Sequence, residues 1–136
     1  MLKKTITYMD YNGVERTEDF YFNLSKPELL EMELGTTGGF SEMMNKIIAA
    51  KDTASLIKTF KELILKSYGV KSEDGKRFMK SKELSEAFSQ TEAYVNLYME
   101  LSTNDQAASA FANGIIPKEL AKAAIEQTAR IENTDA

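Results

Sequence analysis

The sequence predicts an α+β domain that is mostly α, with an N-terminal β-hairpin packed on a bundle of five to seven short helices. Three observations carry this prediction. The first 24 residues place β-branched and aromatic runs on either side of an Asn12-Gly13 turn signal. The rest of the chain carries apolar residues at helical spacing between capping signals and glycines. A length of 136 residues with 43% hydrophobic side chains suffices for a core of its own.

The hairpin is expected to have strands at residues 3–11 and 14–24, joined by a type I′ turn at Asn12-Gly13. Phe20 and Phe22 share one face of the second strand because side chains alternate, so this face should meet the core. A two-stranded hairpin is marginal in water on its own. We therefore expect it to lie on helices or to gain a strand from a partner.

The first helix is expected over about residues 26–34. Ser25 and Glu28 have the spacing of a capping box, and Pro27 is tolerated in the first turn. The glycine-rich segment 35–39 should then end this helix.

The next segment, from Phe40 to Ile48, repeats apolar residues with the period of one helical face. A further helix follows Asp52 or Thr53, either of which can cap it. Its apolar positions between residues 56 and 68 form the clearest helical stripe in the chain. Gly69 is expected to end this helix.

Residues 71–77 read as a charged turn with Asp-Gly at its tip, and Phe78 could anchor this loop to the core. Residues 82–101 form either one helix or two helical pieces with a bend at Ser89. A short alanine-rich helix then runs to Gly114, which is expected to close it. Pro117 opens a last helix.

These elements are expected to form a single domain over residues 1–131, with the hairpin at 1–24 and the helical part at 25–131. Residues 132–136 should fray. No stretch has the length and apolarity of a signal peptide or a membrane span, so the sequence predicts a cytoplasmic protein.

The chain contains no cysteine and no histidine, which excludes disulfides, thiolate nucleophiles, Cys/His zinc sites and histidine relays. Carboxylates remain as candidate general acids or bases, and Glu28, Glu31 and Glu33 share the first helix. No nucleophile stands near them in sequence, so we interpret them as a solvated face. The sequence therefore predicts no enzyme, no catalytic residue, no cofactor and no metal site.

Four segments are weighed as binding sites. Residues 35–39 precede a helix but lack the Gly-Lys-Ser/Thr of a phosphate loop, so a turn is favoured over an anion site. Asp74-Gly75 lacks the ligand pattern of a calcium loop. Lys71 to Lys82, with five positive and two negative side chains, is the best case for nucleic acid but lacks a stacking platform. Met43-Met44 is expected in the core, with an adaptable binding groove as the alternative.

The net charge of −4 argues against a nucleic acid or an anionic membrane as the main partner. This charge is unevenly distributed. Residues 1–57 carry a net charge of −3, residues 58–82 carry +5 and residues 83–136 carry −6. The basic middle and the acidic end are complementary, which favours head-to-tail association of copies into a homo-oligomer.

Several segments together resemble a family of tail assembly chaperones encoded by long-tailed bacteriophages and prophages of Gram-positive bacteria. The resemblance covers about residues 3–120. It is carried by Thr5-Ile6-Thr7-Tyr8, Asn12-Gly13, Phe20-Tyr21-Phe22-Asn23-Leu24-Ser25, Glu33-Leu34-Gly35-Thr36-Thr37-Gly38-Gly39, Phe60-Lys61-Glu62-Leu63-Ile64-Leu65-Lys66, Tyr68-Gly69, Asp74-Gly75-Lys76-Arg77-Phe78, Gln90-Thr91-Glu92-Ala93-Tyr94 and Asn113-Gly114-Ile115-Ile116-Pro117.

The resemblance implies a non-enzymatic protein that acts on the tape measure protein and the tail tube protein in the host cytoplasm. It also implies self-association, absence from the finished particle and, in many members, a longer form made by a ribosomal frameshift. A groove lined by methionine and leucine is suited to cover an apolar stripe of a helical tape measure protein. The alternatives are a structural virion component, such as a connector or tail protein, and a small nucleic-acid-binding regulator that uses residues 71–82.

Overall fold

The computed structural model describes residues 1–39, 42–43, 46 and 49–116. It confirms an α+β fold that is mostly helical, with an N-terminal antiparallel hairpin. In chain order the described elements are β1 (Leu2–Met9), β2 (Glu15–Phe22), α1 (Lys26–Gly35), α3 (Thr53–Ser67), β3 (Tyr68–Lys71), β4 (Phe78–Met79), α4 (Lys82–Ser89), α5 (Glu92–Thr103) and α6 (Asp105–Ile115).

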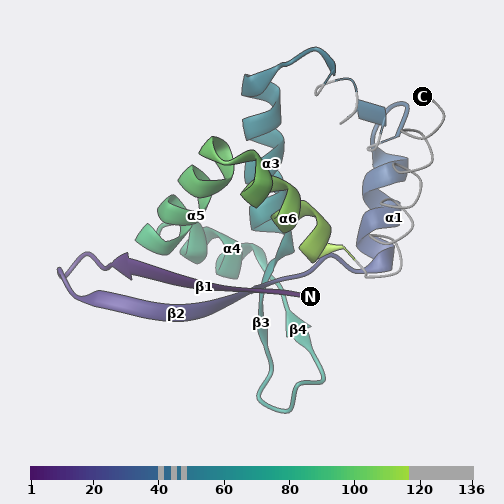
Figure 1. Ribbon diagram of the computed structural model, residues 1–136. Coiled ribbons are helices and arrows are strands. Elements are labelled where there is room, and N and C mark those ends of the chain that lie inside the picture. The colour runs from purple at the N-terminus through teal and green to yellow at the C-terminus, as the bar shows by residue number, and fades with distance from the viewer. Residues whose placement is uncertain (40–41, 44–45, 47–48, 117–136) are drawn as a thin grey trace.

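The sheet has four antiparallel strands in the order β1-β2-β3-β4. The predicted charged turn at residues 71–77 is therefore the tip of a second hairpin, β3–β4, which points away from the helices in Figure 1. β3 joins β2 through the pairs Tyr21–Gly69 and Phe22–Tyr68. The first hairpin thus gains its additional strand from its own chain.

The turn between β1 and β2 differs from the expected type I′ turn. Such a turn needs positive φ at both central residues, but only Gly13 is left-handed, at φ 77°. The Asp10 carboxylate accepts bonds from the backbone N–H groups of Asn12 and Val14, both at 2.9 Å. The side chain of Asp10 therefore organises a longer turn, which the Asn-Gly pair alone does not reveal.

The core lies between the inner face of the sheet and the helices α3 to α6. Phe22 is fully buried there, and its ring meets those of Tyr68, Phe88 and Phe111 at centroid distances of 5.3–5.9 Å. The prediction that Phe20 and Phe22 face the core is confirmed. The outer face of the first hairpin stays polar, with Thr7 and Thr17 hydroxyls 3.0 Å apart, as is usual for antiparallel sheets covered on one side.

The helices begin where capping residues stand in the sequence. Asp52 caps α3 by accepting from the Ser55 N–H group at 3.1 Å, and Ser81 caps α4. The predicted bend at Ser89 is confirmed, because α4 ends at this residue. Thr91 caps the following helix.

Two glycines have roles other than the predicted helix ends. Gly69 lies inside β3, where a Cβ atom would come within 2.7 Å of the Phe78 ring and 2.9 Å of the Met79 carbonyl oxygen. Gly114 lies inside α6, where a Cβ atom would come within 2.9 Å of the Leu2 side chain. Both glycines therefore allow close packing between elements.

Three predicted segments fall mostly or wholly on residues that the structure does not describe. Most of the helix predicted from Phe40 to Ile48 lies outside the described residues. The predicted helix that starts at Pro117 and the predicted frayed tail at 132–136 lie outside them as well.

We expect Gly69→Ala to lower the free energy of unfolding by about 1–3 kcal/mol, because the methyl group overpacks against a backbone carbonyl. Gly35→Ala is the matched control. Gly35 has no atom within 4 Å of its Cβ position and ends α1, so alanine should be neutral or stabilising there. Urea unfolding of both variants measures the difference. Equal stability of the two would contradict the close approach at Gly69.

Candidate functional site

Helix α1 is an outlying element of the molecule. Among its residues none is buried, although half-buried Leu29 and Met32 pack against the core. On its outer side Leu30 is 60% and Leu34 is 78% exposed. Figure 1 shows α1 at one side of the molecule, apart from the sheet and from the other labelled helices. A helix with apolar residues on both sides and no buried face has apolar surface left to cover.

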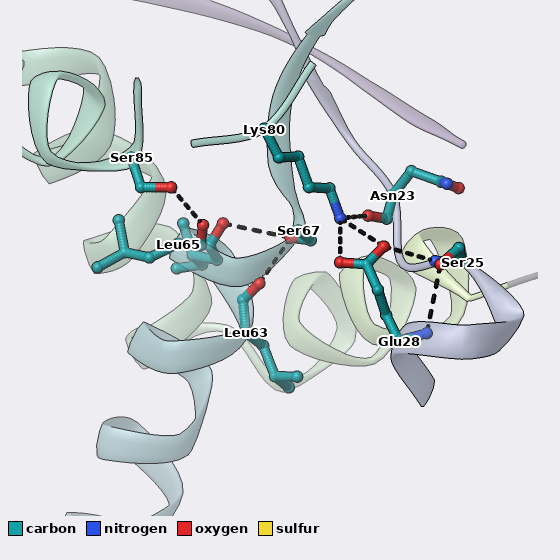
Figure 2. A network of polar contacts seen from close by, with 9 residues as sticks. Asn23, Ser25, Glu28, Leu63, Leu65, Ser67, Lys80 and Ser85 are labelled. Carbon is teal, nitrogen blue, oxygen red and sulfur yellow. Dashed lines mark hydrogen bonds and ion pairs between the residues drawn. The ribbon is translucent and has the colours of Figure 1, made fainter. Parts of the chain in front are cut away.

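A polar cluster joins the start of α1 to the sheet (Figure 2). The Lys80 ammonium donates to both carboxylate oxygens of Glu28 at 2.8 Å and to the carbonyl oxygen of Asn23 at 2.5 Å. Ser25 and Glu28 complete the predicted capping box, because each side chain accepts from the other residue's backbone N–H group. We call Asn23, Ser25, Glu28 and Lys80 the α1 clasp.

The clasp determines the charge state of Glu28. Partial burial by itself raises the pKa of this carboxyl group, but the bonds from Lys80 and Ser25 outweigh it and hold the pKa below its usual value. Glu31 and Glu33 are exposed, as a solvated face requires. That interpretation is wrong for Glu28, which is half-buried and bonded across the fold.

A groove of about 330 Å³ lies between α1 and α3. Apolar atoms of Met32, Met43 and Leu63 line it. Charged residues stand at its sides: Glu31 from α1, and Glu62 and Lys66 from α3. We call this feature the α1–α3 groove. An apolar floor with charged sides fits an amphipathic helix, whose apolar stripe is flanked by polar residues.

Of the methionine pair, the structure describes only Met43. Met43 is half-buried and lines the α1–α3 groove, which agrees with the alternative of an adaptable binding surface. Met44 lies outside the described residues.

Two other candidate segments form ordinary turns. In the glycine-rich segment, the Gly39 N–H group donates to the Thr36 carbonyl oxygen at 2.9 Å, which closes a turn. In the β3–β4 turn, Asp74 accepts from the Ser72 hydroxyl at 2.6 Å and from the Lys76 N–H group at 3.0 Å. Both observations favour the turns that the sequence predicts at these places.

The basic segment from Lys71 to Lys82 is partly used inside the molecule. Lys80 belongs to the clasp, and the Lys82 ammonium lies 3.8 Å from the Glu86 carboxylate one helical turn away. Within the described residues no cluster of three or more acidic side chains has the geometry of a metal site. No described helix is long and apolar enough to cross a membrane.

Sequence reasoning identified the capping box but missed Lys80, because a lysine in a basic loop carries no local sign of a partner 52 residues away. It also missed the exposed side of α1. The spacing gives one usable signal: at about 100° per residue, Leu30 and Leu34 lie on a different side of the helix from Met32.

A family model described as phage tail assembly chaperone matches residues 1–136, which is the whole chain. No curated protein and no solved structure matches the chain.

We expect Lys80→Met to lower the free energy of unfolding by about 1–2 kcal/mol at pH 7, a value that allows for the partial exposure of the ion pair. Glu28→Gln should have a smaller effect of the same sign, because glutamine still completes a capping box. Glu86→Gln removes a carboxylate from an exposed pair and is the matched control, with little expected change. Urea unfolding measures all three.

The same variants test the pH dependence. The folded-state pKa of Glu28 is lowered, so its stabilising contribution is complete above the pKa of an unfolded glutamate, about 4.3. It is lost as the pH falls through the lower folded-state pKa. The stability difference between the wild type and Glu28→Gln should therefore shrink on acidification below about pH 4. A difference that stays constant from pH 7 to pH 3 would show that Glu28 does not titrate as described.

Proposed function

The chain belongs to the phage tail assembly chaperone family, and on this premise we propose that it binds the tape measure protein and the tail tube protein in the host cytoplasm during tail assembly. It acts through contact surfaces and catalyses no reaction. The observation that supports this proposal best is the α1–α3 groove, an apolar groove lined by two methionines beside a helix with no buried residue.

The groove suits a client that is a long amphipathic helix. Methionine side chains are flexible and polarizable, so they adapt to different apolar stripes. The outer side of α1 adds Leu30 and Leu34, which are four residues apart and therefore adjacent on the helix surface. A helix that covers this region removes apolar surface from water on both partners, which keeps the client from aggregating until it is handed over.

The proposal includes a single domain over residues 1–131 and a homo-oligomer. The opposite net charges of residues 58–82 and 83–136 support contacts between copies. Lys71, Lys76 and Arg77 are exposed on the β3–β4 hairpin, where an acidic surface of another copy can reach them.

We expect the tape measure protein, co-expressed with this protein, to be retained in a pull-down at micromolar concentrations. Met43→Glu should weaken retention at least about tenfold, because a carboxylate in the groove loses water when the client binds. Met99→Glu is the matched control, since Met99 is 53% exposed on α5, away from the groove. Thermal unfolding of both variants confirms that the fold is intact.

A wild-type protein that retains neither tail protein would contradict the proposed function. Equal losses from both methionine variants would instead reject the groove as the site. Mass spectrometry of purified particles separates a transient chaperone from a structural virion component, because only the latter is present in stoichiometric copies.

A further inference from the structure

Strand β2 pairs on both sides over only a quarter of its length. All eight residues, Glu15–Phe22, pair with β1, but the described pairs with β3 are limited to Tyr21 and Phe22. Figure 1 shows the reason: the β3–β4 hairpin turns away from β2 just beyond these two pairs. The segment 15–20 is therefore an open strand edge of six residues, about 20 Å long at the usual rise per residue.

The direction of the open backbone groups follows from the pairing of β2 with β3. The Asn23 N–H group donates to the Ser67 carbonyl oxygen at 2.8 Å, on the β3 side, in the same register as the Tyr21–Gly69 pair. Because backbone groups alternate between the two sides of an antiparallel strand, those of Glu15, Thr17 and Asp19 also point to this side. They face the open edge.

Helix α5 contacts the other edge of the same hairpin. The Asn96 side-chain amide donates to the carbonyl oxygen of Thr7 at 3.2 Å. Lys4 and Glu100 form an ion pair at 3.2 Å between the same two elements. Among the described residues, the edge of β1 thus has a side-chain partner, whereas no pairing is seen along residues 15–20 on the β3 side of β2.

A cleft of about 290 Å³ lies where the two strands separate, between residues 18–21 of β2 and residues 68–71 of β3. On its β3 side the Lys71 ammonium lies over the Tyr21 ring, 4.2 Å from the ring centroid. The β2 edge on the other side is acidic. The charge of Arg16 is balanced by Asp10, 2.6 Å away. The carboxylates of Asp19 and Glu18 accept hydrogen bonds from the hydroxyl groups of Thr5 and Tyr8. Because these hydroxyl groups are uncharged, the negative charges of Asp19 and Glu18 are not balanced by them.

We propose that the open edge of β2 binds an extended segment of a partner protein, which pairs with residues 15–20 beside the cleft where β3 separates from β2. The segment carries lysine or arginine at alternate positions, opposite Glu15 and Asp19 on the outer face of the sheet. Its other positions are apolar and lie beside Phe20, which packs on the Phe88 ring at 5.3 Å. Backbone hydrogen bonds supply affinity and the acidic residues supply selection, as in other strand-addition sites.

The charge of the edge disfavours a second copy of this chain as the occupant. Antiparallel pairing of two β2 edges about Thr17 would bring Glu15 of one copy opposite Asp19 of the other, and like charges directly opposite each other destabilise a sheet. The same register brings Arg16 opposite Glu18, but Arg16 is already paired with Asp10 of its own chain. A helical partner is also disfavoured, because a helix satisfies its own backbone groups and leaves those of Thr17 and its neighbours without partners.

The probe is a fluorescein-labelled octapeptide that alternates lysine and valine. The control peptide has the same side chains but N-methyl groups at alternate backbone positions, which prevent strand pairing. We expect the wild-type protein to bind the first peptide at least about tenfold more tightly than the second, measured by fluorescence anisotropy at two salt concentrations. Hydrogen exchange should show new protection at the amides of Thr17 and Asp19.

Two variants test whether the peptide binds at the edge of β2. Thr17→Pro removes one outward N–H group, a change that strand edges tolerate, and should weaken binding at least about tenfold. Glu15→Lys should weaken it about threefold or more, whereas the matched charge reversal Glu83→Lys on exposed α4 should not. If Thr17→Pro fails to fold, Glu15→Lys and the N-methylated peptide still test whether the peptide pairs with the edge of β2.

Equal binding of the two peptides, or unchanged binding by Glu15→Lys, would overturn the proposal. It would also be overturned if sedimentation showed that the peptide dissociates an existing dimer, because the edge would then belong to a second copy.

Discussion

The burial of Phe22 is the constraint on which the rest of the structure depends. A hairpin of two strands has one apolar face and cannot hide it by itself. Phe22 ends β2 and is fully enclosed by aromatic rings from β3, α4 and α6. Directly after it, the backbone N–H groups of Asn23 and Leu24 donate to carbonyl oxygens of Ser67 and Ile115. One residue thus joins the sheet to three later segments and fixes the point from which α1 departs.

Helix α1 lies outside this cluster, and its attachment is of a different kind. The sheet and helices α4 to α6 share rings and aliphatic side chains, whereas α1 depends on the clasp at its first turn and on Leu29 and Met32. Elements with few buried side chains open at lower free energy than the core. Helix α1 is therefore attached to the core by the clasp at Glu28 and by two half-buried side chains, rather than by the shared aromatic rings.

Local signals allowed most of the elements to be predicted, since a cap acts within one helical turn. Ser25, Asp52 and Ser81 each begin a helix at the predicted place. The second hairpin was missed because β3 has only four residues and follows α3 without a break. Its Gly69 resembles a helix stop in sequence, and its close approach to Phe78 depends on tertiary packing.

The candidate site was harder to predict than the fold, because its parts meet across long sequence distances. Glu28 and Lys80 are 52 residues apart. The edge of β2 is open because β3 turns away from it after two pairs. Side-chain patterns in the sequence do not show where β3 separates from β2. The two proposed surfaces differ in kind: the α1–α3 groove presents apolar side chains, whereas the edge of β2 presents backbone groups. Because they use different residues on different elements, substitutions such as Met43→Glu and Glu15→Lys test each surface separately.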